Sequence, residues 1–280
     1  MENEAQIRLA FFFGILLVVA GLEILAPRRR LNSPRPIRWL SNLGIVALST
    51  VAVRLAFPII GVQVAAAARE NGWGLLNNLA LPEWLALLLG ILALDLVVYL
   101  QHLMFHAVPL LWRLHMMHHA DLDIDVTTGL RFHPIEIMIS MVIKLTVIAA
   151  LGPSVPAVIL FEIILNGTAM FNHGNFRLPL ALDRYLRLLV VTPDMHRVHH
   201  SVTIRETNSN FGFNFPWWDR LFGTYRAQPA LGHEGMAIGL AQFRDPRKNN
   251  LFSMLALPFV GKTGSYAINR HGTDPDILKK

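Results

Sequence analysis

The stretch HLMFHAVPLLWRLHMMHH, residues 102–119, ends a long apolar segment and carries two histidine motifs, HxxxH and HxxHH. A second HxxHH motif, HRVHH, occupies residues 196–200. Residues three and four positions apart lie on one face of a helix, so each motif directs two or three imidazoles the same way. Imidazole nitrogen is a ligand for Zn, Cu, Fe and Ni, and one such ion takes about four to six ligands. The motifs therefore predict a site for two metal ions.

Two single histidines, His133 and His173, stand at the two ends of the apolar segment 134–172, where they would meet the motifs. For His133 a structural role is the alternative. His233 and His271 lie outside the pattern, and we expect them to be structural or solvated. The predicted metal ligands are His102, His106, His115, His118, His119, His133, His173, His196, His199 and His200.

The composition indicates an integral membrane protein. Of the 280 residues, 53% are hydrophobic and only 16% are charged, which is too apolar for an ordinary soluble domain. The absence of cysteine excludes disulfides, thiolate metal ligands and a thiol nucleophile. The formal net charge of +6 indicates membrane orientation and lipid-headgroup contact. We expect no nucleic-acid partner, because the chain has no basic recognition helix or interleaved aromatic platform.

Four apolar segments, at about 6–26, 37–60, 82–106 and 134–172, are long enough to cross a membrane. Gly152-Pro153 divides the last one, which predicts a hairpin of two short spans or a re-entrant pair. The more polar remainder is expected to form a cytoplasmic cap, with the short apolar segment 251–261 at the membrane interface. The predicted fold is an all-α integral membrane protein with about four transmembrane helices in two hairpins and a helical cap that holds the metal site. Its expected parts are an N-terminal hairpin (1–81), a region of spans and histidine motifs (82–230) and a C-terminal tail (231–280).

Charge predicts the orientation of these segments. Five arginines crowd the connection after the first segment, and no acidic residue lies between Glu23 and Glu70. Since basic loops remain in the cytoplasm, this connection should be cytoplasmic, and every histidine motif should then lie on the same face. We expect the C-terminus on that face too, and a bacterial inner membrane is favoured over the endoplasmic reticulum. The five arginines are Arg28, Arg29, Arg30, Arg35 and Arg38.

The acidic run Asp121-x-Asp123-x-Asp125 resembles the start of a calcium-binding loop. It has Val126 where such a loop needs glycine and Phe132 where it needs glutamate. We therefore expect a solvated loop.

Asp95 lies inside the third apolar segment, seven residues and two helical turns before His102. A carboxylate within a membrane is costly and usually functional. Asp95 could accept a hydrogen bond from an imidazole N–H or bond to another helix, and both readings stay open. Lys144 and Glu162, on opposite arms of the expected hairpin, are predicted to pair with each other.

On these motifs the sequence resembles the fatty acid hydroxylase/sterol desaturase superfamily of membrane-bound di-iron enzymes. That family carries HxxxH, HxxHH and HxxHH in this order, a His-Pro pair followed by an acidic residue, and an isolated histidine before the last motif. The matches here are the three motifs above, His133-Pro134-x-Glu136, and His173 in Asn172-His173-Gly174-Asn175. The family's closing run is matched by Asn210-Phe211-Gly212 and by Trp218 to Tyr225. The resemblance covers residues 82–226.

The resemblance implies four spans, two iron ions bound by histidine, and O2-dependent hydroxylation or desaturation of a sterol-like or fatty-acyl lipid. Zinc could occupy the same ligands in isolated protein. No electron-transfer segment is recognised, so a separate ferredoxin- or cytochrome-type donor and its reductase are expected. A zinc-stabilised scaffold and a metal-ion transporter are the alternatives, although transporters place ligands nearer the membrane midplane.

The resemblance also suggests supporting residues around the metals. Asp95, Asn175 and Asn210 are expected to support the ligands. The third span and the hairpin arms should line a lipid passage, closed on the cytoplasmic side by two tryptophans. The passage residues are Leu103, Phe105, Met138 and Phe171, and the closing tryptophans are Trp217 and Trp218.

Overall fold

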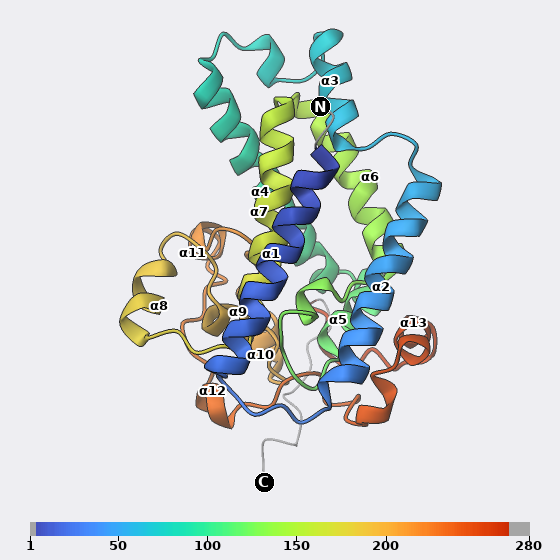
Figure 1. The fold of residues 1–280 in the computed structure, drawn as a ribbon, viewed down its shortest axis with the longest axis vertical. Helices are drawn as coiled ribbons and strands as arrows, with labels where there is room; N and C mark the ends of the chain where they lie inside the picture. Colours follow the sequence, from blue (N-terminus) through green and yellow to red (C-terminus); the bar gives the residue numbers. More distant parts are fainter. Residues whose placement is uncertain (1–3, 269–280) are drawn as a thin grey trace.

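The protein, described here by a computed structural model for residues 4–268, is built from helices around one apolar bundle. Figure 1 shows the long helices running along the long axis, with the short ones gathered at one end as a cap. The long helices are α1 (Glu4–Leu25), α2 (Arg35–Ala56), α4 (Glu83–Ala107), α6 (Pro134–Leu151) and α7 (Val155–Asn172), with α3 (Gly61–Glu70) at the end away from the cap. The helices at the cap end are α5 (Pro109–His119), α8 (Leu180–Leu186), α9 (Pro193–His199), α10 (Ile204–Thr207), α11 (Trp217–Leu221), α12 (Gly232–Gly235) and α13 (Leu251–Val260). Three short 3₁₀ turns cover Leu76–Asn78, Thr128–Leu130 and Pro246–Lys248.

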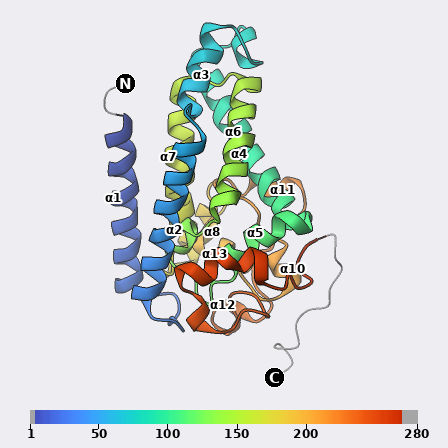
Figure 2. The same cartoon turned by 90° about the vertical axis from the view of Figure 1, so that its right-hand side faces the viewer.

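Within residues 4–268, five helices are long and apolar enough to cross a membrane, so the chain is an integral membrane protein. About four spans were expected. The predicted break at Gly152-Pro153 is confirmed, since 134–172 forms two separate helices of 18 residues each, and counting them separately gives one candidate helix more. The second candidate span, Arg35–Glu70, combines α2 and α3 and is interrupted at Pro58. Figure 2 shows α1 at one side of the bundle, where it packs against α7.

The turn between α6 and α7 is built by its sequence. Gly152 ends α6 with a φ of 62°, a left-handed conformation that glycine adopts without a steric penalty. Ser154 then caps α7 by accepting a hydrogen bond from the backbone N–H of Ala157. The predicted pairing of Lys144 with Glu162 is confirmed, and Arg8 of α1 pairs with the same carboxylate.

The cap is held to the bundle by a buried apolar cluster around Trp112 of α5. Ile45 of α2 and Met254 and Leu257 of α13 pack into this cluster. Tyr266, beyond α13, stacks on the Trp112 ring. The segment after residue 231 therefore packs against the helix that carries the first HxxHH motif.

The prediction of a solvated loop at residues 121–125 is wrong. Asp121, Asp123 and Asp125 are all buried. Arg38 of α2 binds Asp121 and Asp125, at 2.9 and 2.6 Å, and Arg131 lies 3.7 Å from Asp121. Burial alone would raise the pKa of Asp121, but the two guanidinium groups lower it. The compensating charge comes largely from α2, far away in the sequence, so the local pattern did not reveal it.

Candidate metal centre

Nine of the ten predicted ligands gather in two buried groups at the cap end of the bundle. Within each group the candidate ligand atoms all lie within 4.8 Å of one another. The first group is His102, His106, His115, His119 and His199, and the second is His118, His173, His196 and His200. Each HxxHH motif is divided in the same way. Its first and last histidines, four residues apart, belong to one group, and the histidine between them belongs to the other.

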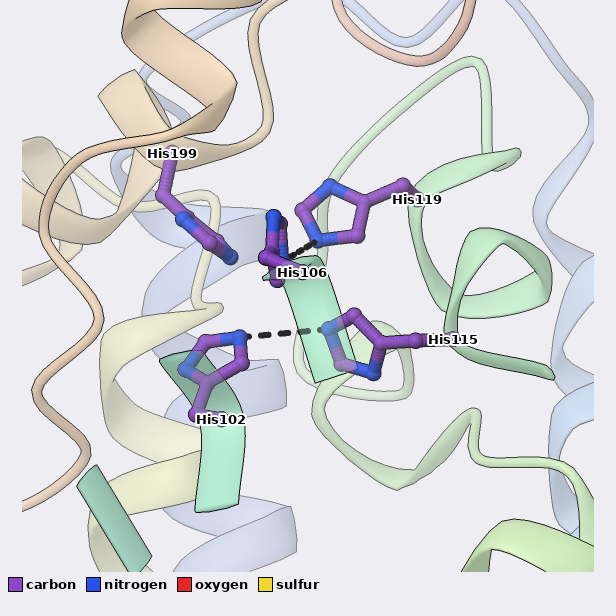
Figure 3. Close-up of side chains that lie close together, drawn as sticks. All are labelled: His102, His106, His115, His119 and His199. Atoms are coloured by element: carbon purple, nitrogen blue, oxygen red, sulfur yellow. Dashed lines mark hydrogen bonds between the residues drawn. The ribbon is translucent and has the colours of Figure 1, made fainter. Parts of the chain in front are cut away.

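The first group brings together α4, α5 and α9. Figure 3 shows its five imidazoles facing a common centre, with His199 reaching in from the opposite side to His115 and His119. The Nε2 atoms of His102 and His115 are 3.1 Å apart, and those of His106 and His119 are 3.2 Å apart. The Nε2 atom of His199 has no hydrogen-bond partner among the described residues.

The second group converges on His173, which directly follows α7. Its Nε2 atom lies 3.2 Å from that of His118, 3.1 Å from that of His196 and 3.2 Å from that of His200. Three separate nitrogens therefore surround one nitrogen at hydrogen-bonding distance.

The protonation state of these rings tests whether a metal fits. Burial lowers the pKa of His115 and of His173 to about 3, and it lowers the pKa of His118 and His200 well below the usual value. Neutral imidazoles whose Nδ1 carries the proton present only lone pairs at Nε2. Lone pairs that face one another at about 3 Å repel unless a cation lies among them. The all-nitrogen groups of five and four donors therefore fit two transition-metal ions.

In five of the nine rings the outer Nδ1 atom is held by a hydrogen bond. His102 donates to the backbone carbonyl of Phe211 at 2.8 Å, and His199 donates to that of Ser209 at 2.8 Å. His115 donates to the Glu136 carboxylate at 2.7 Å. Such contacts fix the tautomer and aim Nε2 inward. His106 likewise bonds to the Asn208 side chain and His173 to the carbonyl of Ala169.

The loop that supplies these carbonyls depends on Asn210 and Asp219. Asn210 has a φ of 53°, and its side chain donates to the carbonyls of Met195 and Arg226. The Asp219 carboxylate accepts hydrogen bonds from the backbone N–H groups of Phe211 and Gly212, each at 2.8 Å. These contacts place Asn210 where it supports the ligands, through the loop and not by touching a ring.

The other two expected supporting residues lie elsewhere. Asp95 accepts a hydrogen bond from the Trp218 indole at 2.7 Å, whereas the His102 ring bonds to a backbone carbonyl. Of the two readings left open for Asp95, the structure shows the bond to another helix, because its partner Trp218 lies in α11. The Asn175 side chain bonds to the backbone of Arg29 and so ties the loop after His173 to the α1–α2 connection.

Sequence reasoning missed Glu136, Asn208 and Asp219 as supporting residues. Glu136 was visible only as the acidic residue of the His-Pro motif. On α6 it contacts His115 of α5, and the spacing of residues within either helix does not predict this contact. Asn208 and Asp219 act from a loop whose path depends on the tertiary structure.

His133 lies in neither histidine group. Its Nδ1 accepts the backbone N–H of Ile135 as the cap of α6, and its Nε2 lies 3.3 Å from the carbonyl of Leu255. Both ring nitrogens are therefore engaged by backbone groups. His233 also lies outside the groups, 3.6 Å from Asp194, and His271 falls outside the described residues.

The residues predicted to line a lipid passage are spread over several surroundings. Phe105 is fully buried beside the His115 ring, and Leu103 and Met138 are half-buried. Phe171 packs against Phe176 in the cluster between α1 and α7. The two tryptophans differ, because Trp217 is 38% exposed and bonds to the carbonyl of Leu188, whereas Trp218 is half-buried on Asp95.

An apolar helical bundle with two buried histidine groups at one end is typical of membrane-embedded proteins that bind metals. A sequence model described as "Fatty acid hydroxylase" matches residues 87–224, which include all nine grouped histidines. The matched region, residues 87–224, and the relatives below support membership in the fatty acid hydroxylase/sterol desaturase superfamily.

The similar curated proteins are named as lipid hydroxylases or monooxygenases. The chain is 27% identical over 230 residues to the ornithine lipid hydroxylase OlsE of Rhizobium tropici, across 78% of this chain and 66% of that protein. It is 29% identical over 150 residues to the alkylglycerol monooxygenase of Homo sapiens, across 52% of this chain and 31% of that protein. The chain is 30% identical over 142 residues to the alkylglycerol monooxygenase of Xenopus tropicalis, across 49% of this chain and 30% of that protein. The chain thus spans less than two thirds of these relatives, and no solved structure is significantly similar to it.

Proposed function

We propose that this chain is a membrane-bound oxygenase that holds two iron ions and oxidises a C–H bond of a lipid. The observation that supports this best is the convergence of nine neutral imidazoles in two adjacent groups. Iron is preferred over zinc because zinc is redox-silent. The names of the relatives favour hydroxylation over desaturation.

The reaction needs O2 and two electrons. Hydroxylation converts R–H, O2, two electrons and two protons into R–OH and water. Desaturation would use the same inputs, remove two hydrogens from the lipid and release two waters. The iron ions would supply the redox chemistry for O2 reduction. The electrons would come from a separate ferredoxin- or cytochrome-type donor and its reductase.

The surrounding side chains would keep water away from the centre. Phe132 stacks on the His118 ring with centroids 4.4 Å apart, and Trp112 lies 4.8 Å from the His106 ring. Phe211 and Phe213 complete this aromatic wall, at 5.0 Å from His106 and 5.2 Å from His102. A dry site strengthens every electrostatic interaction inside it and limits side reactions of the oxidant.

The lipid would reach the metals from the bilayer, along α4, α6 and α7. Phe171, just before His173, tests this route. Phe171→Ala should change which lipid or which carbon is oxidised, while two metals stay bound. Replacing a fully buried phenylalanine by alanine lowers the free energy of unfolding by roughly 3–5 kcal/mol. Phe171 is only half-buried, so the loss should be smaller. Folding of the variant is checked first. A folded variant with unchanged products would place the route elsewhere, and one without metal would make Phe171 a support of the site.

We further propose that the cap faces the cytoplasm, in a bacterial inner membrane. The orientation rests on the arginines of the connection between α1 and α2, which lies at the cap end. The bacterial membrane is favoured by the similarity to a Rhizobium protein.

Turnover is tested with iron-loaded protein in lipid nanodiscs, supplied with a ferredoxin, its reductase and NADPH. We expect O2 consumption and a lipid product heavier by 16 mass units, or lighter by 2 for desaturation. His199→Ala should abolish both. Two bound metals with neither O2 uptake nor product under every donor tested would favour the zinc-stabilised scaffold. Metal uptake into sealed vesicles would favour a transporter.

A further inference from the structure

A pocket of about 490 Å³ opens at the connection between α1 and α2, outside the histidine centre. Figure 1 shows this connection at the cap end of the two helices. Arg29, Arg30 and Arg35 line the pocket together with Glu23 and Ser33. The charged lining thus carries three positive charges and one negative charge. The remaining lining residues are Ile24, Pro27 and Leu31.

Four of these residues each carry a buried polar atom without a hydrogen-bond partner in the part of the chain that the structure describes. They are the Nη1 atom of Arg29, the Oγ atom of Ser33, the Nε atom of Arg35 and the Oε2 atom of Glu23. A buried polar atom without a partner costs about 1–3 kcal/mol, so four around one pocket require an explanation. A ligand that pairs with them supplies one.

The donors match a phosphate. Two guanidinium groups and a hydroxyl offer N–H and O–H donors to phosphate oxygens, and Arg30 adds an exposed positive charge at the rim. The Arg35 Nη2 atom is directed to the backbone carbonyl of Glu23, so its Nε–H is left for a ligand.

Glu23 adds an acceptor for a positive group. Its Oε1 atom accepts hydrogen bonds from the backbone N–H groups of Val126 and Asn175, at 2.7 and 2.8 Å, and its Oε2 atom is left over. Glu23 is only 1% exposed, and a buried carboxylate oxygen calls for an N–H donor or a cation. A primary ammonium group next to a phosphate satisfies it.

The pocket adjoins the ends of two helices that are long and apolar enough to cross a membrane. It adjoins the end of α1, where Ile24 is 67% and Leu25 is 82% exposed, and the first turns of α2, where Leu40 is 74% exposed. Exposed apolar side chains directly beside a basic pocket are typical of lipid-headgroup sites on the cytoplasmic side. The acyl chains would lie along these side chains.

We propose that this pocket binds the headgroup of a phosphatidylethanolamine-type phospholipid, with the phosphate on the arginines and the ammonium group on Glu23. Phosphatidylglycerol has the phosphate but no cation, and the quaternary ammonium of phosphatidylcholine has no N–H to donate. The site is separate from the metal centre and does not depend on the proposed oxidation.

Native mass spectrometry of the full-length protein in detergent tests this with three lipids that share the same acyl chains. We expect phosphatidylethanolamine to bind about tenfold more tightly than phosphatidylglycerol or phosphatidylcholine, the effect of one hydrogen bond to a charged group. Arg29→Gln with Arg35→Gln should weaken its binding by about tenfold or more. Arg184→Gln with Arg205→Gln, an equal loss of two charges at exposed cap positions, should have no effect.

Glu23→Gln separates the two halves of the site, because glutamine keeps an oxygen for Val126 and Asn175 and replaces only Oε2. It should bring phosphatidylethanolamine down to the affinity of phosphatidylglycerol. Equal binding of all three lipids by the wild type, or full binding by the double arginine variant, would overturn the proposal. If the double arginine variant does not fold, the single variants Arg30→Gln and Glu23→Gln are used instead. Wild-type affinity for phosphatidylethanolamine in both single variants would equally overturn the proposal. Displacement of the lipid by an equal concentration of glycerophosphoethanolamine would show that a soluble phosphate, and not a lipid, is the ligand.

Discussion

Glu136→Gln should weaken metal binding although Glu136 is not itself a metal ligand. The Glu136 carboxylate lies 2.7 Å from Nδ1 of His115, and both side chains are at most 5% exposed. A hydrogen bond to a charged group contributes about 1.5–3 kcal/mol, and outer partners of metal-bound histidines typically account for 10–100-fold in affinity. Glutamine keeps an acceptor but removes the charge, so we expect a loss of about tenfold, or ~1.4 kcal/mol. Glu136→Ala, which also removes the acceptor, should approach 100-fold.

Chelator competition followed by elemental analysis measures these affinities. Asp95→Asn is the matched control, since Asp95 is another buried carboxylate of a membrane helix but binds Trp218 and not an imidazole. Its metal affinity should stay within about twofold of the wild type. The reasoning fails if Glu136→Gln binds metal as tightly as the wild type. It also fails if Asp95→Asn loses as much, because the effect would then be general destabilisation.

Three further predictions concern the ligands, the topology and pH. Metal-replete wild type should hold about two metal ions per chain and His199→Ala fewer, whereas His133→Ala should keep two; equal losses in elemental analysis would place His133 among the ligands. A reporter inserted in the 28–36 connection should read cytoplasmic and one in 71–77 should read on the opposite side, and a cytoplasmic signal at 71–77 would contradict the charge-based orientation. Metal-free protein should lose thermal stability as pH falls from about 6.5 towards 3, because burial lowers the folded-state pKa of His115 to about 3 and the unfolded chain then binds more protons; an unchanged melting temperature between pH 7 and 5 would speak against neutral buried imidazoles.

The local parts of the site could be read from the sequence, because they depend on helical spacing. His102 and His106 share a face of α4, and the first and last histidines of each HxxHH motif share a group. The apolar segments likewise predicted the long helices, and Gly152-Pro153 predicted the turn between α6 and α7. These features need only neighbours within a few residues.

Long-range electrostatics could not be read in the same way. The acidic run at Asp121 looked like a solvated loop because its partner, Arg38, lies 83 residues earlier. The sequence could not choose between the two readings of Asp95, because its partner Trp218 lies 123 residues later. Burial makes such pairings obligatory, but sequence distance hides them.

By itself, the sequence determined that histidines would be presented in helical sets at the end of apolar spans, since spacing and hydropathy are properties of single segments. Only the tertiary structure decided how those sets are shared. It sends His118 and His199 each to the group opposite the rest of its motif, and it leaves His133 as a helix cap. The physical reason is that a metal site is a convergence of lone pairs in space, and convergence depends on how α4, α5, α7 and α9 pack and on the loop carbonyls that aim each ring.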